Sequence, residues 1–440
     1  MLNRRVRPPK PWLLGLCVVS CVALLSTPAR AQDAAPTPTP APKVAAPPAG
    51  EVRALWVVRT TLVSKKSIEE MVERAAANGF NTLIVQVRGR GDAYYRSQWE
   101  PRAVTLKEQP TDFDPLAHTI KEARRKKLKV HAWVNTNLLA NLDELPVEPA
   151  HVYNAHPEWL AVPRAVAAEL YSMPPRDPRY RASIVEWSKA NRAELEGVYV
   201  APARAEVREH VYSIWMDLLA RYEVDGLHFD YVRFASPDFD YSRASLERFR
   251  AWLDPHLSSE ERRLLDRALQ SDPLAAADSY RERFADFQRE QVTVLVERIF
   301  HGVKKRRPGT IVSAAVFAND ENARERRFQD WRRWLALGLL DVVCPMAYST
   351  DTEVFRKQIE VARAAANVSG KRVWAGIGAY RVTPESAVEK INAARAAGAD
   401  GVILFSYDSA TKTGPLNPSG DYLERVRRAA FDPPPRAAAP

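Results

Sequence analysis

The feature that most constrains the fold is a regular alternation of apolar, β-rich runs with segments of helical period. Each run is almost continuously apolar, which is typical of parallel strands covered on both faces. After each run, apolar residues recur every three or four positions, as in SIEEMVERAAANG and TPESAVEKINAARAAG. The eight runs span residues 52–59, 82–88, 129–135, 226–234, 310–317, 341–348, 372–380 and 401–407.

Eight strand–helix units predict an α/β fold of the (β/α)8 TIM-barrel type. A doubly wound open sheet is the alternative, but no phosphate-binding glycine turn follows the first run. Two long insertions interrupt the repeat, residues 136–200 after the third strand and residues 235–272 after the fourth. Loops that follow the strands of a barrel lie at its C-terminal face, so we expect these insertions to wall a substrate groove.

The two ends of the chain differ in composition from the region between them. Residues 1–31 combine a basic start, an apolar run and the pattern Ala-Arg-Ala, which predicts a cleaved signal peptide and a secreted or periplasmic protein. An uncleaved signal anchor is the alternative, although the apolar run is short for a membrane span. We expect a Pro/Ala-rich linker over 32–50, the barrel domain over 51–430 and a disordered tail over 431–440.

Cysteine content and charge exclude several classes of protein. Cys344 is the only cysteine outside residues 1–31, so neither a disulfide framework nor a cysteine-based zinc site is expected. The formal charge is +10, and five of the basic residues lie within residues 1–31. The remaining charge is too dispersed to indicate nucleic-acid binding, but it suits contact with anionic envelope polymers. We expect a monomer with no membrane span after signal removal, and the sequence indicates no cofactor.

Polar side chains occur where the expected strands end, which is where TIM barrels hold their active sites. The leading candidate is Asp230, in the run VDGLHFDYVRF, because a carboxylate inside an apolar strand is costly unless it is paired or used. The alternative to a catalytic role is a structural ion pair between Asp230 and Arg233. Glycoside cleavage requires two carboxyl groups. We expect the second to come from Asp320 or Glu321, with Asp92 and Asp408 as competitors.

Aromatic and polar residues at other strand ends suit a sugar-binding groove. Flat rings stack on sugar faces, although any single aromatic residue is more often part of the core. His228 lies one layer below Asp230, so inner-layer hydrogen bonding is its alternative role. The expected substrate-binding residues are Arg88, Asp92, His131, Trp133, Asn135, His228, Tyr231, Arg233, Tyr348, Tyr380 and Tyr407.

Several longer stretches carry a family resemblance. They include EVRALWVVR, NGFNTLIVQVRGRGDAYYRSQWEP, HPEWL, VDGLHFDYVRF, FQDWRRWLALGLLDVVCPMAYS, GIGAY and GVILFSY. On these stretches the chain resembles the bacterial glycosyl hydrolase-like family 10 domain, a secreted barrel related to enzymes that act on peptidoglycan glycan strands stripped of their peptides. The Asp230 run also resembles an α-amylase-type pattern, which implies a nucleophilic role for Asp230. The family resemblance implies a groove built from Arg88, Asp92, His131, Asn135, Asp230, Tyr348 and Tyr380.

These observations favour a glycoside hydrolase that acts on an envelope polysaccharide, with the peptidoglycan glycan backbone as the first candidate. In this hypothesis Asp230 is the essential carboxylate, and Arg88, His131 and Asn135 orient sugar hydroxyl or N-acetyl groups. A glycan-binding barrel without turnover is the second hypothesis, since the sequence does not identify the second carboxylate that would act with Asp230. A metal-dependent polysaccharide deacetylase that uses His131, His228 and Asp230 is the third hypothesis. Its structural alternative is that these side chains form hydrogen bonds with other residues in the barrel interior.

Overall fold

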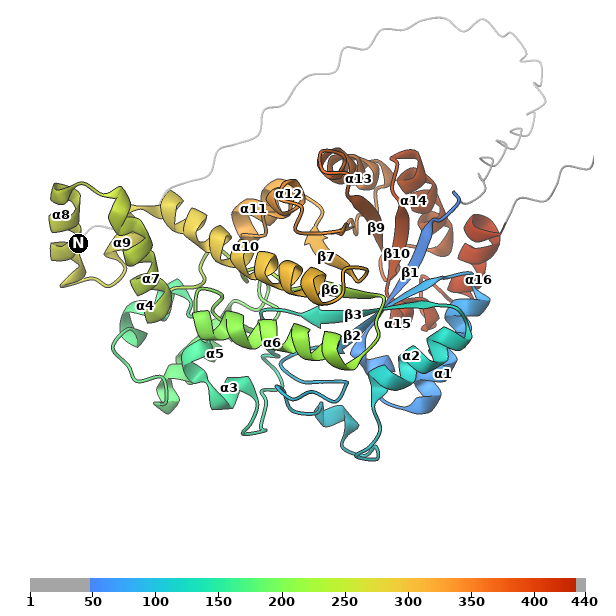
Figure 1. Ribbon diagram of the computed structural model, residues 1–440, viewed down its shortest axis with the longest axis horizontal. Helices are drawn as coiled ribbons and strands as arrows, with labels where there is room; N and C mark the ends of the chain where they lie inside the picture. Colours follow the sequence, from blue (N-terminus) through green and yellow to red (C-terminus); the bar gives the residue numbers. More distant parts are fainter. Residues whose placement is uncertain (1–47, 433–440) are drawn as a thin grey trace, which may run out of the picture. The chain divides into compact units, whose positions relative to one another are not determined.

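The computed structural model describes residues 48–432, and a closed barrel of parallel strands forms its centre (Figure 1). This confirms the predicted (β/α)8 TIM barrel. The expected signal peptide, most of the expected linker and the last eight residues, 433–440, lie outside the described residues. The barrel strands in their order around the barrel are β1 (Val52–Val57), β2 (Thr82–Arg88), β3 (Lys129–Asn135), β6 (Gly226–Asp230), β7 (Ile311–Phe317), β8 (Val342–Met346), β9 (Arg372–Gly378) and β10 (Gly401–Phe405), which pairs with β1.

Helices cover the outside of the barrel between successive strands. α1 (Lys65–Ala77) begins after Ser64, whose hydroxyl accepts the N–H of Ser67 at 3.1 Å. Asp114 and Thr383 cap α2 (Pro115–Arg125) and α14 (Pro384–Ala396) in the same way. The remaining helices of this layer are α6 (Ala205–Arg221), α10 (Arg281–Arg306), α11 (Asp320–Arg327), α12 (Trp331–Ala336), α13 (Thr352–Asn367), α15 (Tyr407–Thr411) and α16 (Tyr422–Val426).

Phe431, at the start of the expected tail, still belongs to the packed structure. Its ring lies edge-on to Phe80 with a centroid separation of 5.2 Å, and both rings are buried.

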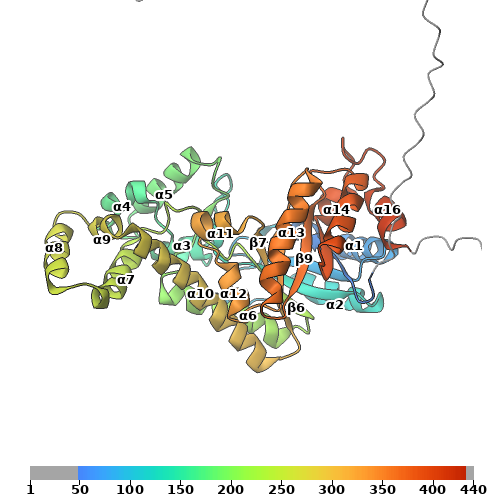
Figure 2. The ribbon, with the colours of Figure 1, turned by 90° about the horizontal axis from the view of Figure 1, so that it is seen from above.

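Two insertions enlarge the C-terminal face of the barrel, as the sequence predicts. The second insertion, which follows β6, lies away from α14 and α16 in both views (Figures 1 and 2). The carboxylate of Asp240 joins the two insertions, because it accepts the N–H of Val162 at 2.9 Å. The first contains β4 (Leu138–Ala140), α3 (Val152–Ala155), α4 (Arg164–Leu170), α5 (Pro178–Ala190) and β5 (Val198–Tyr199), and the second contains α7 (Arg243–Leu253), α8 (Ser259–Leu269) and α9 (Ala275–Ser279).

The barrel strands bury side chains on both faces, which explains their continuous apolar runs. One set packs beneath the helices, and the other fills the barrel interior around Trp56, Trp133 and Trp374. The register of β3 with β6 pairs Trp133 with His228, and Asn135 with Asp230. Asn135 and Asp230 are therefore neighbours at the C-terminal rim, and His228 lies one layer below them.

β6 is shorter than the predicted strand over residues 226–234. It ends at Asp230, because Tyr231 has a φ of 49°, in the left-handed region that extended strands do not use. Arg233 therefore belongs to the following loop. The early end of β6 makes Asp230 the last strand residue, at the mouth of the barrel.

Candidate active site

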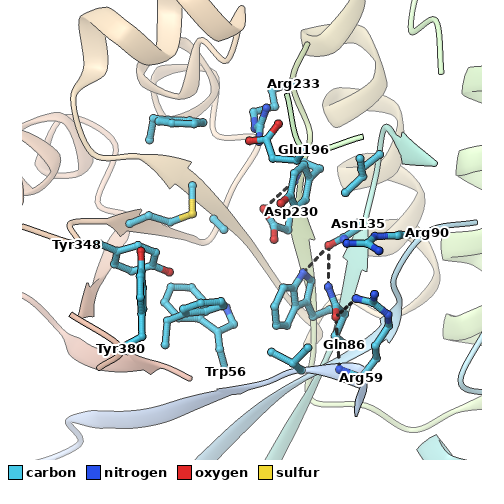
Figure 3. A pocket seen from close by; sticks show the side chains of 18 residues that line it. Trp56, Arg59, Gln86, Arg90, Asn135, Glu196, Asp230, Arg233, Tyr348 and Tyr380 are labelled. Carbon is cyan, nitrogen blue, oxygen red and sulfur yellow. Dashed lines mark hydrogen bonds and ion pairs between the residues drawn. The ribbon is translucent and has the colours of Figure 1, made fainter. Parts of the chain in front are cut away.

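A cavity of about 480 Å³ opens at the C-terminal ends of the barrel strands (Figure 3). Sites for small ligands typically have volumes of about 300–1,000 Å³. Its charged lining residues are Arg59, Arg90, Glu196, Asp230 and Arg233, and its aromatic lining residues are Trp56, Trp133, Tyr231, Phe317, Tyr348, Tyr380 and Phe405.

Asp230 forms part of the floor of this cavity. Its side chain lines the cavity although the residue is only 8% exposed, and its Oδ1 accepts the N–H of Tyr231 at 2.7 Å. Burial raises the pKa of Asp230 to about 6, against the opposing effects of the Tyr231 N–H and the charge of Arg233. A carboxyl group with this pKa can carry a proton near neutral pH and deliver it to a substrate.

Glu196 provides a second carboxylate in the same cavity. Arg233 donates to its Oε1 at 2.7 Å, and the hydroxyl of Tyr199 donates to its Oε2 at 2.7 Å. Burial alone would raise the pKa of Glu196, but Arg233 and Tyr199 outweigh it and hold the pKa below its ordinary value. Glu196 is therefore ionised under conditions in which Asp230 can be protonated.

Arg233 is held in place by aromatic rings. Its guanidinium carbon lies 4.6 Å from the ring centre of Tyr231, 5.1 Å from that of Phe317 and 5.8 Å from that of Tyr199. A planar guanidinium gains from such stacking where a lysine ammonium does not to the same extent. This packing fixes the cation that keeps Glu196 charged.

One wall of the cavity is polar. The amide oxygen of Asn135 accepts the indole N–H of Trp133 at 2.8 Å and an amide N–H of Gln86 at 3.3 Å. The Gln86 oxygen in turn accepts an N–H of Arg59 at 3.0 Å. The amide nitrogen of Asn135 donates to the backbone oxygen of Gly89 at 2.8 Å. This chain of hydrogen bonds fixes the orientations of the two amides that line this wall.

The opposite wall is aromatic (Figure 3). The ring of Tyr348 stacks on Phe405 with a centroid separation of 5.5 Å and meets Tyr380 edge-on at 5.9 Å. Tyr380 is 48% exposed, which is unusual for a large aromatic side chain in this protein. An exposed ring at the mouth of a cavity offers a flat apolar surface to the face of a sugar.

Comparison with known proteins identifies the family. The model of the family described as Glycosyl hydrolase-like 10 matches residues 51–189 and 183–393. The chain belongs to the glycosyl hydrolase-like 10 family. Glycosyl hydrolase DigH of Escherichia coli (strain K12) is 22% identical to it over 88% of this chain and 86% of that protein. Glycosyl hydrolase YngK of Bacillus subtilis (strain 168) is 20% identical over 68% of this chain and 54% of that protein.

Solved structures share the fold at low sequence identity. The PgaB (BpsB) glycoside hydrolase domain from Bordetella bronchiseptica has a TM-score of 0.57 and 14% identity, over 87% of this chain and 99% of that one. The catalytic domain of β-amylase from Paenibacillus polymyxa has a TM-score of 0.58 and 12% identity, over 88% and 99%. These similarities confirm the TIM-barrel fold. The family membership identifies the chain as a glycosidase, which favours turnover over a barrel that only binds glycan. No helix within residues 48–432 has both the length and the apolar character needed to cross a bilayer.

The two histidines predicted to bind substrate lie beneath the cavity of this glycosidase and do not line it. The Nε2 atom of His228 accepts the indole N–H of Trp56 at 3.0 Å, so its Nδ1 carries the proton and donates to the Ser313 hydroxyl at 2.8 Å. Burial lowers the pKa of His228 well below its ordinary value and that of His131 to about 4. Both rings are therefore neutral parts of the barrel interior.

This arrangement does not favour the deacetylase hypothesis. A metal site built on His131, His228 and Asp230 would need ring nitrogens that are free to bind an ion. Both nitrogens of His228 already have protein partners. Within residues 48–432, the one group of His, Cys, Asp or Glu side chains close enough together to share an ion is Glu69, His118 and Glu122, on the outer helices α1 and α2.

Arg88 and Asp92 stabilise the loop after β2 and do not line the cavity. Arg88 is 2% exposed and forms a two-bond ion pair with Glu100, at 2.8 and 2.6 Å. It also donates to the backbone oxygen of Asn135. Asp92 accepts the N–H of Arg90 at 2.8 Å. These contacts tie the loop to the end of β3, and both predicted substrate-binding residues lie outside the cavity lining.

The predicted partners of Asp230 are not near it. Asp320 and Glu321 begin α11, beyond the end of β7, and line a separate hollow on the surface. There Asp320 pairs with Arg332. β7 ends at Phe317, and Ala318 and Asn319 separate this strand end from the two carboxylates. The carboxylates therefore lie outside the cavity.

After β10, whose last residue Phe405 lines the cavity, the chain turns away from it. Tyr407 is the first residue of α15 and is buried outside the cavity lining. The carboxylate of Asp408 accepts the N–H of Val58 at 2.9 Å and the hydroxyl of Thr61 at 2.5 Å. Asp408 therefore holds the loop after β1 in place.

Glu196, Arg59 and Arg90 line the cavity, although the pattern of polar residues at strand ends did not predict them. Glu196 lies in the insertion over residues 136–200, where no barrel strand is predicted and strand periodicity therefore does not show which residues face the cavity. The neighbouring Gly197 is required by the fold, since a Cβ at that position would lie 2.0 Å from the backbone oxygen of Ala140, but this close approach is a tertiary contact that the local sequence does not report. Arg59 and Arg90 each lie two residues beyond the end of a strand, so the residues that directly follow the strand ends carry the sequence signal for both.

Proposed function

We propose that this glycosidase hydrolyses an envelope polysaccharide, with the peptidoglycan glycan backbone as its substrate. The observation that carries the proposal is a pair of carboxyl groups with opposed pKa shifts in one cavity. Burial raises the pKa of Asp230 to about 6, and Arg233 holds that of Glu196 below its ordinary value. Glycoside hydrolysis uses one protonated and one ionised carboxyl group, and opposed environments of this kind assign the two roles.

In the proposed reaction Asp230 is the general acid. Its proton passes to the glycosidic oxygen as the bond to the anomeric carbon breaks. Glu196 supplies the ionised carboxylate, and its charge stabilises the oxocarbenium-like transition state. The role of Asp230 thus differs from the nucleophilic one that the α-amylase-type pattern implies, because a pKa of about 6 leaves part of the group protonated near neutral pH.

The two walls of the cavity suit a sugar chain. Tyr380 and Tyr348 offer ring faces on one side, and Asn135 and Gln86 offer amide groups on the other. The choice of peptidoglycan rests on the family resemblance and on the predicted signal peptide over residues 1–31, which would place the enzyme in the compartment that holds this polymer. We propose that the exported enzyme acts as a monomer.

Peptide-free glycan strands and an assay for new reducing ends test this proposal. We expect Asp230→Asn and Glu196→Gln each to lower kcat by about 10²–10⁴-fold, the usual contribution of a general acid or base. Glu321→Gln is the matched control, since the structure places Glu321 outside the cavity. Loss of activity in Glu321→Gln with full activity in Glu196→Gln would restore the prediction made from the sequence.

The stereochemistry of the product gives the role of Glu196. If Glu196 attacks the anomeric carbon directly, the first product retains its configuration, and if Glu196 activates water, the configuration inverts. Proton NMR of the first-formed reducing end distinguishes the two outcomes.

A further inference from the structure

Two arginines line the cavity without a carboxylate partner. Figure 3 shows Arg59 and Arg90 on the side of the cavity that carries Gln86 and Asn135, opposite Tyr348. In the part of the chain that the structure describes, no carboxylate oxygen lies within 4.0 Å of either guanidinium. Arg233, by contrast, is paired with Glu196. The wall formed by Arg59 and Arg90 therefore carries positive charge that the protein does not neutralise by direct pairing.

The two guanidinium groups lie close enough to affect each other. Burial lowers the pKa of Arg90, and the charge of Arg59 lowers it further. These two effects outweigh the opposing ones of Tyr231, Asp92 and Glu144, none of which forms an ion pair with Arg90. The Nε of Arg90 is buried and has no hydrogen-bond partner. Bringing like charges together away from water is unfavourable unless an anion joins them. This arrangement is suited to a ligand that brings a negative charge.

The position of Arg59 depends on a glycine. A Cβ at Gly89 would lie 2.4 Å from Cδ of Arg59 and 2.7 Å from its Nε. The side chain of Arg59 can therefore cross the backbone only where residue 89 has no side chain. One N–H of Arg59 donates to Gln86 at 3.0 Å, and the Tyr94 hydroxyl lies close to the same guanidinium. A guanidinium has five N–H groups, so others can still donate to a ligand.

We infer that Arg59 and Arg90 form a subsite for a carboxylate carried by a sugar, namely the lactyl ether carboxylate of an N-acetylmuramic acid residue next to the scissile bond. Guanidinium groups match carboxylates through parallel, charge-assisted hydrogen bonds. In peptidoglycan that carries peptides, this carboxyl group is an amide and has no charge. Removal of the peptide leaves it free. The inference rests on the proposed function and states which form of the glycan the cavity would prefer.

The test compares two forms of one substrate. Peptide-free glycan strands are used as they are, and after conversion of their carboxyl groups to methyl amides. We expect amidation to raise the KM of the wild-type enzyme about ten- to a hundredfold, the effect of losing a hydrogen-bonded charge worth about 1.5–3 kcal/mol. This measurement needs no variant, so it does not depend on how well a variant folds. Equal KM values for the two forms would overturn the inference.

Variants then show whether these two arginines recognise the charge. Arg59→Gln and Arg90→Gln should raise the KM for the free acid by a similar factor and leave the KM for the amide nearly unchanged. Arg381→Gln is the matched control, since Arg381 is exposed, follows Tyr380 and does not line the cavity. An equal rise of KM on both substrates in Arg59→Gln and Arg90→Gln would overturn the inference, because it would show a general structural role.

Binding to Asp230→Asn by isothermal titration calorimetry distinguishes this inference from the proposed function. Tighter binding of peptide-free strands than of their amides supports the subsite, independently of turnover. Cleavage of both forms at equal KM overturns the subsite and leaves the proposed function intact. Failure to bind or cleave either form overturns both. Preferential binding of hyaluronan oligosaccharides, which carry glucuronate, would overturn the lactyl carboxylate as the source of the charge.

Discussion

Replacing Asp230 with asparagine should stabilise the folded protein at neutral pH while it removes most of the activity. Burial raises the pKa of Asp230 from 3.8 to about 6. One pKa unit corresponds to about 1.36 kcal/mol, so the ionised group lowers the free energy of unfolding by about 3 kcal/mol. Asparagine has nearly the same shape and keeps the oxygen that accepts the N–H of Tyr231, but it carries no charge.

The sign of the pH dependence follows from proton binding. Between pH 3.8 and about 6 the folded state binds the proton of Asp230 more tightly than the unfolded state does. Stability therefore falls as pH rises through this window, and the full penalty is present above it. The difference in stability between Asp230→Asn and wild type should be below about 1 kcal/mol at pH 4 and approach about 3 kcal/mol at pH 7.5.

Urea unfolding followed by tryptophan fluorescence at the two pH values measures this difference. Asp225→Asn is the matched control, because Asp225 immediately precedes the same strand, pairs with Lys129 at 2.8 Å and accepts the N–H of Val130 at 2.9 Å. We expect this control to lose stability and to keep its activity. If Asp230→Asn were less stable than wild type at pH 7.5, or if its advantage were the same at both pH values, the reasoning about burial would be refuted.

Three further predictions concern other parts of the site. Glu100→Gln should lower the free energy of unfolding by about 3–5 kcal/mol, because it leaves the buried charge of Arg88 unpaired, and the urea midpoint measures the loss. Tyr380→Ala should raise KM about two- to tenfold with unchanged stability, as loss of one exposed stacking face predicts, and steady-state kinetics with a melting curve check this. Arg233→Lys keeps the charge but loses the stacking, so its kcat should lie between those of wild type and Glu196→Gln while KM changes little.

The barrel could be predicted because hydrophobic periodicity reports which faces of an element are covered. Parallel strands that are covered on both sides have continuous apolar sequences. Eight such strands with helices between them are compatible with few fold topologies, of which the (β/α)8 barrel is one. The position of the cavity could be predicted as well, because the sites of TIM barrels lie at the C-terminal ends of the strands and the sequence indicates where the strands end. The predicted site residues that line the cavity are Trp133, Asn135, Asp230, Tyr231, Arg233, Tyr348 and Tyr380.

The remaining site residues depend on depth and local register, which periodicity does not report. Strand alternation places Gln86 and Arg88 on one face, but the pairing of β2 with β3 shifts between them. Gln86 consequently lines the cavity, while Arg88 is buried against Glu100. His228 points into the barrel as predicted, but it lies one layer below Asp230 and does not reach the cavity.

The second carboxylate could not be predicted because it comes from an insertion and not from a strand end. The position of Glu196 is set by tertiary contacts. Gly197 allows the chain to approach Ala140, and β5 then pairs with β4. These contacts join residues more than fifty positions apart, so no local pattern in the sequence reports them.

The proposed acid and its ionised partner therefore have separate structural origins. Asp230 belongs to the barrel, and its raised pKa follows from its burial at the end of β6. Glu196 belongs to the insertion, and its charge follows from contact with Arg233. Asn137 links the two parts, since its amide donates to the backbone oxygen of Arg233 at 3.1 Å and its own backbone oxygen accepts the N–H of Val200 at 2.9 Å.

This linkage has a consequence for activity. Any change that loosens the β4–β5 pair should reduce turnover before it unfolds the barrel, because it moves Glu196 and leaves Asp230 in place. The barrel strands pair only with one another around the closed sheet, and β4 and β5 form a separate two-stranded sheet. The β4–β5 pairing can therefore be lost without breaking a hydrogen bond between barrel strands. We therefore expect the proposed catalytic pair to be lost at a lower urea concentration than the barrel fold, which activity and tryptophan fluorescence measured along one urea titration would show.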